Sequence, residues 1–287
     1  MDVAYAFDHS YVPYAQTAIE SLLDQHPDRP IRVWVVLDED ITDADCELLA
    51  SQVGSRAVIE FLHTTHELTG RDLPASSIAP HISRAMYMRL LLPHLLPPDV
   101  SRVLYLDSDT LCVGPIDALG SIDLAGAVVG AVRDPYTRRL SDNGALPGIV
   151  DGPLRLDPRS PYFNSGMMLI DTAAWREGRI TEVALDYIAR HADAARYPDQ
   201  DALNYALYER WHRLPKHWNY AMPYRLETAM GGNLADARII HFIGPEKPWT
   251  SLYWPGETQE AYCRYLRQAQ EAVVCSVEHE SRTVPST

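Results

Sequence analysis

Asp107 and Asp109, separated by one serine, have the spacing best suited to metal binding in this sequence. They lie within residues 103–113, where an apolar run predicts a buried strand. In an extended chain residues i and i+2 point to the same side, so both carboxylates can face one point. A hard divalent cation that also holds a diphosphate would offset their repulsion. The alternative is that Asp107 begins a turn and Asp109 caps the next element. Their position at the end of a strand, where open α/β sheets bind ligands, favours the metal.

A second group of candidate ligands follows a predicted strand at residues 238–242. His241 could bind a metal ion, and Lys247 offers a compact cation for a phosphate. Gly244 permits close approach of the backbone to a ligand. A histidine on a strand is more often a core or surface residue, but here glycine, lysine and tryptophan follow it within one loop.

Two further segments carry side chains suited to a polyhydroxylated ligand. The amide of Asn164 can both donate to and accept from sugar hydroxyls, although a turn or bulge role beside Gly166 is the alternative. Asp199, Gln200 and Asp201 precede a predicted helix. Asp199 is either the N-cap of that helix or part of a sugar-binding cluster.

The elements that must position these residues alternate along the chain, which predicts a doubly wound, mostly parallel sheet flanked by helices. A long loop is expected at residues 137–161, because Gly, Pro, Asp and Arg are frequent there, and such loops often bind ligands. Strands are predicted at 3–7, 31–37, 58–62, 103–113, 125–133, 162–171, 211–218 and 238–242, and helices at 14–23, 42–53, 84–92, 175–191, 202–208 and 260–274.

The turn after the first predicted strand lacks the usual phosphate-binding glycines. The sequence has neither G-x-G-x-x-G at this point nor a Walker-type lysine loop, which weakens the dinucleotide dehydrogenase and P-loop ATPase hypotheses. The turn offers Asp8, which could accept a hydrogen bond from a base or ribose, and Tyr11, whose ring could stack on a base. A packing role for Tyr11 is the favoured alternative on this evidence alone.

The composition predicts one soluble, intracellular domain. The 287 residues carry a formal net charge of −14, which argues against a nucleic-acid partner. The four cysteines are far apart and show no zinc or disulfide pattern, which suits a reducing compartment. The start of the chain does not resemble a signal peptide, and no apolar run approaches the roughly 18 residues of a membrane span. We expect a single domain over residues 1–275 and a loose tail at 276–287.

With these motifs in order, the sequence resembles the retaining glycosyltransferases of family 8, which include bacterial lipopolysaccharide galactosyl- and glucosyltransferases and glycogenins. The resemblance covers nearly the whole chain as far as Trp249. It implies a GT-A fold, a UDP-sugar donor, and a manganese ion, with magnesium as the alternative, held by Asp107, Asp109 and His241. The motifs that carry it are Leu-Tyr-Leu-Asp107-Ser-Asp109, Phe163-Asn-Ser-Gly166, Asp199-Gln-Asp-x-x-Asn204 and His241-Phe-x-Gly244-x-x-Lys247-Pro-Trp249.

Matching positions imply roles for individual residues. Asp8, Tyr11 and Ser10, where relatives often have Asn, would contact uridine, and Arg89 would hold the donor phosphate or sugar. Asn164, Asp199 and Gln200 would surround the transferred sugar, with Ser108 and Ser165 also assigned to the donor site. Gly244 and Lys247 would grip the diphosphate. Asp134 follows the strand that in relatives carries an acceptor-binding aspartate. The loop at 137–161 gives no acceptor signature.

The implied reaction moves galactose or glucose from the UDP-sugar to a hydroxyl of a glycan, a glycolipid or a small natural product. Front-face attack, with Gln200 stabilising the oxocarbenium-like sugar, is favoured over double displacement through Asp199 or Asp201. The alternative functions are a sugar nucleotidyltransferase and a non-catalytic sugar-nucleotide-binding protein. The sequence leaves self-glucosylation open, and it leaves open whether a cytoplasmic enzyme attaches to the inner face of the membrane.

Overall fold

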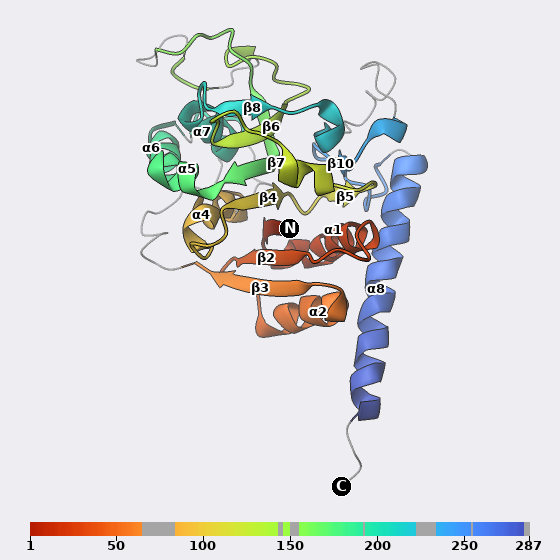
Figure 1. The fold of residues 1–287 in the computed structure, drawn as a ribbon. Helices are drawn as coiled ribbons and strands as arrows, with labels where there is room; N and C mark the ends of the chain where they lie inside the picture. The colour runs from red at the N-terminus through yellow and green to blue at the C-terminus, as the bar shows by residue number, and fades with distance from the viewer. Residues whose placement is uncertain are drawn as a thin grey trace.

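The computed structural model describes residues 1–64, 84–142, 146–149, 155–191, 193–221, 234–253 and 255–283. Within them, a seven-stranded sheet has the order β3-β2-β1-β4-β7-β6-β8 (Figure 1). β7 runs antiparallel to β4 and β6, whereas the other paired strands are parallel. The mostly parallel sheet predicted from the sequence is confirmed, and the antiparallel strand β7 makes it a mixed sheet. Its strands are β1 (Asp2–Phe7), β2 (Arg32–Leu37), β3 (Val58–His63), β4 (Arg102–Leu106), β6 (Val129–Arg133), β7 (Phe163–Asp171) and β8 (Trp211–Arg213).

Alternate residues of the strands pack into two cores on opposite faces of the sheet, as the two-residue period of a strand requires. Val3, Tyr5 and Phe7 pack with helices α1 (Val12–Asp24) and α2 (Asp43–Val53). Ala4 and Ala6 belong to the core formed with four other helices. These are α4 (Met88–Leu95), α5 (Thr172–Glu177), α6 (Ile180–His191) and α7 (Pro198–Ala206).

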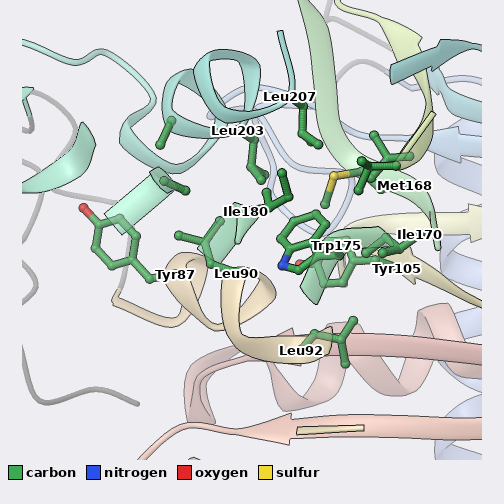
Figure 2. Close-up of a cluster of buried hydrophobic side chains, with 14 of the residues drawn as sticks. Tyr87, Leu90, Leu92, Tyr105, Met168, Ile170, Trp175, Ile180, Leu203 and Leu207 are labelled. Atoms are coloured by element: carbon green, nitrogen blue, oxygen red, sulfur yellow. The ribbon is translucent and has the colours of Figure 1, made fainter. Parts of the chain in front are cut away.

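Figure 2 shows the core under these four helices. Trp175 of α5 is fully buried and lies in one cluster with Leu90 of α4, Ile180 of α6 and Leu203 of α7. Truncation of such a side chain to alanine costs about 3–5 kcal/mol. This packing fixes α7, which carries the predicted sugar-binding residues, against the sheet.

A smaller, three-stranded sheet has the order β5-β10-β9, formed by Thr110–Cys112, Ile239–His241 and Tyr220–Ala221. The long helix α8 (Glu257–Thr283) packs against both α1 and α2 and runs across them (Figure 1). It continues past Ser276, where a loose tail was expected. Among the described residues, none of the helices combines the length and apolar character of a membrane span.

The predicted strand at 103–113 was wrong in one respect, because the structure divides it. β4 ends at Leu106, Asp107–Asp109 form a turn, and β5 joins the smaller sheet. The turn is closed by Thr110, whose Oγ1 donates to the carbonyl of Asp107 at 2.8 Å. The two aspartates therefore lie where the chain passes from one sheet to the other.

Two predicted helices also have different bounds. The helix expected at 175–191 consists of α5 and α6, because Arg179 has a φ of 52° and interrupts the helical path. The helix expected at 202–208 begins earlier, at Pro198, whose fixed φ suits a first helical position. Asp199 therefore lies inside the first turn, and the N-cap interpretation was wrong, since the N-cap residue is Tyr197.

Smaller differences affect the connecting segments. The strand expected at 211–218 covers only β8, and a 3-10 helix, η6 (Lys216–Asn219), follows it. The helix expected at 84–92 starts as a 3-10 helix, η3 (Arg84–Tyr87), and continues as α4. The described parts of the loop at 137–161 contain no α-helix and no strand, while 143–145 and 150–154 lie outside the described residues.

Candidate active site

A cavity of about 580 Å³ opens at the carboxyl ends of β1 and β4, where the strand order reverses. This is the place at which open α/β sheets bind ligands. Ser10 was predicted for the site but is exposed and does not line the cavity; its Oγ donates to Asp8 Oδ1 at 2.6 Å. All the other predicted residues line it: Asp8, Tyr11, Arg89, Asp107, Ser108, Asp109, Asp134, Asn164, Ser165, Asp199, Gln200, His241, Gly244 and Lys247.

Asp107, Asp109 and His241 bring their ligand atoms within 4.8 Å of one another. Nε2 of His241 lies 3.2 Å from Asp109 Oδ1 and 3.7 Å from Asp107 Oδ2. Oδ1 of Asp109 is buried and accepts no hydrogen bond from the described residues. Two carboxylates and an imidazole with one unsatisfied buried oxygen form a donor set that fits a divalent cation.

Lys247 supplies a positive charge to the same cluster. Its Nζ lies 2.5 Å from Asp109 Oδ2 and donates to the carbonyl of Phe242 at 2.7 Å. Burial alone would raise the pKa of Asp109, but the Lys247 ammonium outweighs burial and holds that pKa well below its usual range. Asp109 therefore remains a carboxylate, the form that can bind a metal ion.

Arg89 holds a second pair of carboxylates in place. It reaches Asp107 with NH2 to Oδ1 at 3.0 Å, and its Nε lies 3.2 Å from Asp199 Oδ2. The same guanidinium donates to the carbonyls of Met86 at 3.0 Å and Ser165 at 3.3 Å. With these donors engaged by the protein, Arg89 orients Asp107 and Asp199 at the cavity wall that it helps to form.

Polar groups beside Arg89 form one connected network. Gln200 accepts the backbone N–H of Ser165 at 3.0 Å and donates to Asp134 Oδ2 at 3.4 Å. Asn164 donates to the same oxygen at 3.1 Å. Burial raises the pKa of Asp199, the carboxylate of α7 that faces the cavity. The network presents both donors and acceptors, which suits sugar hydroxyls.

Asp201 is placed differently from its neighbours. Its carboxylate is fully buried, accepts the Tyr162 hydroxyl at 2.5 Å and does not line the cavity. Burial raises the pKa of Asp201 to about 7. The hypothesis that Asp201 could attack a sugar is therefore not supported, whereas Asp199 lines the cavity.

The end of the cavity near β1 is lined by Asp8 and Tyr11. The Tyr11 ring makes edge contacts with Tyr14 and Trp249, at centroid distances of 5.4 and 6.1 Å. Tyr14 and Trp249 are themselves stacked at 3.7 Å. Burial raises the pKa of Tyr11 to about 12, so its hydroxyl stays neutral. The aromatic group fixes one ring at the cavity, as base stacking would require.

Sequence reasoning missed several residues of the site. Tyr136, Arg196 and Tyr197 line the cavity, and the Arg196 guanidinium lies 5.4 Å over the Tyr197 ring. The sequence feature that could have identified them is that they lie next to or close to Asp134 and Asp199 in the chain. Asn219 contacts His241 from η6, and nothing in its sequence context marks it.

This architecture is a GT-A glycosyltransferase fold, because the chain matches the structure of LgtC with a TM-score of 0.76 over 94% of its length. The chain belongs to glycosyl transferase family 8, which it matches over residues 2–253. This assignment confirms the resemblance inferred from the four motifs.

Named relatives are consistent with this assignment. The chain is 29% identical over 266 residues to general stress protein A of Bacillus subtilis, covering 88% of each chain. It is 28% identical over 262 residues to lipopolysaccharide 1,2-glucosyltransferase of Escherichia coli, covering 87% of this chain and 72% of that one. The structure of the galactosyltransferase LgtC in complex with donor and acceptor sugar analogs is similar, with 26% identity, a TM-score of 0.76 and coverage of 94% and 96%.

Proposed function

We propose that this protein moves galactose or glucose from a UDP-sugar to a hydroxyl acceptor, with retention of the anomeric configuration. The observation that carries the proposal is the convergence of Asp107, Asp109, His241 and Lys247 at the cavity beneath the sheet switch point. The three ligands would hold Mn²⁺, with Mg²⁺ as the alternative. When bound, such an ion supplies positive charge at the diphosphate.

The leaving group is UDP, which develops negative charge on its β-phosphate as the sugar departs. Lys247 would donate to that phosphate, and Gly244, with a φ of 95°, lets the backbone of the same loop approach it. Stabilisation of charge where it develops is the largest expected contribution to catalysis. At the other end, Asp8 and Tyr11 would contact the uracil and ribose. Ser10 would act through the Asp8 carboxylate that it orients.

The contacts of Gln200 favour front-face attack. Its Oε1 already accepts the backbone N–H of Ser165, and an amide oxygen is a poor nucleophile. In the proposed step the acceptor oxygen bonds to the anomeric carbon on the face from which UDP leaves. The bond from that carbon to the phosphate breaks, and a phosphate oxygen takes the hydroxyl proton. Gln200 and Asp199 would stabilise the positive charge on the sugar, and a covalent sugar adduct on Asp199 would contradict this mechanism.

The acceptor would enter past Tyr136 and Tyr197, beside Asp134. The Tyr136 side chain is 46% exposed at the cavity, as expected of a surface on which a sugar ring can pack. The names of the lipopolysaccharide glucosyl- and galactosyltransferase relatives support a glycan or glycolipid acceptor. We place the reaction in the cytoplasm, consistent with the free thiols of Cys46, Cys112 and Cys263.

The experiment is to measure UDP release from a panel of nucleotide sugars, with Mn²⁺, with Mg²⁺ and with a chelator. We expect metal-dependent hydrolysis of one UDP-hexose, and Asp109→Ala should abolish it. Asp117→Ala is the matched control, because Asp117 is a half-exposed surface carboxylate paired with Arg29 at 3.5 Å. Mass spectrometry of the protein in the same reactions detects self-glycosylation.

The outcomes separate the competing functions. Dependence on pyrophosphate would indicate a sugar nucleotidyltransferase. Binding of UDP-sugars without UDP release, even with a panel of saccharide acceptors, would indicate a non-catalytic binding protein. If the protein neither binds any nucleotide sugar nor releases UDP from one, the proposed function is refuted.

A further inference from the structure

Asn219 is buried beside the histidine of the proposed metal site. It is the last residue of η6, and Tyr220 and Ala221 then pair with Ile240 and His241 of β10. This register places the Asn219 side chain, which is 3% exposed, against the imidazole. Its Oδ1 lies 3.0 Å from His241 Nδ1, and its Nδ2 donates to Asn164 Oδ1 at 2.9 Å.

The direction of these hydrogen bonds is set by a backbone group. The N–H of Gly166 can only donate, and it reaches Asn164 Oδ1 at 3.1 Å, so this atom must be the amide oxygen. The Asn219 atom that contacts the same oxygen must then be its NH₂ group. Consequently the Asn219 oxygen faces His241 Nδ1, and that nitrogen must carry the proton.

The other end of the chain of contacts is fixed in the same way. The Asn164 NH₂ group donates to Asp134 Oδ2 at 3.1 Å. Oδ1 of Asp134 accepts the backbone N–H groups of Tyr136 at 2.9 Å and Thr137 at 2.8 Å. Backbone N–H groups therefore hold in place the two groups that the asparagine NH₂ groups contact, which are Asn164 Oδ1 and the Asp134 carboxylate. Rotating either amide by 180° would bring two donors or two acceptors together in a buried site.

We propose that Asn219 is a positioning residue that keeps the proton of His241 on Nδ1 and directs the Nε2 lone pair at the site shared with Asp107 and Asp109. This proposal rests on the proposed function, because it concerns the metal site of that function. Neutral histidine can bind a metal through either nitrogen, and the hydrogen bond at the other nitrogen selects which. Here the nitrogen left free is the one 3.2 Å from Asp109 Oδ1.

The first test reads the proton position directly. Long-range ¹H–¹⁵N spectra of protein labelled at histidine identify which ring nitrogens carry protons, and His241→Gln assigns the signals. We expect Nδ1 of His241 to be protonated in the wild-type protein, both without metal and with diamagnetic Mg²⁺. An unprotonated Nδ1 would overturn the proposal, and this result needs no variant of Asn219 to fold.

The second test measures Mn²⁺ binding by electron paramagnetic resonance of the free ion. Asn219→Leu keeps the approximate shape but removes both hydrogen bonds, and we expect about ten- to a hundredfold weaker binding with loss of the Nδ1–H signal. The matched control is Thr172→Val, which removes a buried hydrogen bond to the carbonyl of Val100 away from the site and should leave binding unchanged. Wild-type Mn²⁺ affinity in folded Asn219→Leu would contradict the inference. Absence of Mn²⁺ binding by the wild type would instead contradict the proposed metal dependence. The two proposals can be told apart because the first test reads the proton position of His241 without any metal.

Discussion

Replacing Gly166 by alanine should damage the metal site while leaving the fold intact. Gly166 lies in β7, and its carbonyl accepts the N–H of Asp107 at 2.8 Å. A Cβ atom at this position would lie 2.1 Å from His241 Cε1 and 2.6 Å from Asp107 Oδ2. The backbone of Gly166 is not in the left-handed region, so the expected effect is steric and falls on two of the three proposed ligands.

The size of the effect follows from these distances. The imidazole would have to retreat by about 1.3 Å to reach an ordinary contact of 3.4 Å. A misplacement of about 1 Å can reduce catalysis by roughly a hundredfold, and overpacking in a core costs about 1–3 kcal/mol. We therefore expect at least a hundredfold loss of UDP release and a clear loss of Mn²⁺ affinity. The melting temperature should fall by only several degrees, at about 2–4 °C per kcal/mol.

Gly130→Ala provides the matched control for this substitution. Gly130 is a buried glycine of β6 in the same sheet, and a Cβ there would lie 2.9 Å from Leu124 Cδ2 and 3.2 Å from Leu214 Cδ1. We expect a small loss of thermal stability and unchanged Mn²⁺ binding, because leucine ends can move. Wild-type Mn²⁺ affinity and UDP release in Gly166→Ala would refute the steric reasoning.

Two further substitutions test ionisable groups, Lys247 at the cavity and Asp201 in the buried interior. Lys247→Met should weaken UDP binding by about ten- to a hundredfold, because a charge-assisted hydrogen bond is worth about 1.5–3 kcal/mol. Mn²⁺ binding without nucleotide should stay equal or improve, since Asp109 loses a competing cation. Calorimetry with UDP and with Mn²⁺ alone tests both expectations. Burial raises the pKa of Asp201 to about 7, so the folded protein keeps a proton that the unfolded chain releases near pH 4. The free energy of unfolding should therefore fall by on the order of 4 kcal/mol as the pH rises from about 4 to about 7. Asp201→Asn should remove that fall, and parallel pH profiles of unfolding for wild type and variant would contradict the assignment.

The sequence was sufficient to identify most residues that line the cavity because their signals are local. Asp107-Ser108-Asp109 follows an apolar run, and Lys247 lies close to His241 in one loop. The alternation of strands and helices likewise predicted the sheet. These features depend on period, turn residues and neighbours in the chain, which a sequence displays directly.

Contacts between distant segments were not predictable in this way. Asn219 meets His241 and Asn164 only because η6 packs against both β10 and β7. The role of Arg89 was also only partly anticipated, since its guanidinium binds Asp107 and Asp199 from a third element. Such pairings are set by tertiary packing, and a single sequence carries no mark of which buried amide will face which ligand.

The convergence of the two aspartates shows a prediction whose outcome was right and whose geometry was wrong. An extended strand would have aligned Asp107 and Asp109 by its two-residue period, but the structure has a turn at this point. The turn transfers the chain to the smaller sheet, where Thr110 pairs directly with His241 across β5 and β10. The same change of sheet therefore exposes the aspartates to the cavity and brings the histidine to them. Asp107, Asp109 and His241 would not lie together if the strand continued, which gives the second sheet a direct role in assembling the candidate site.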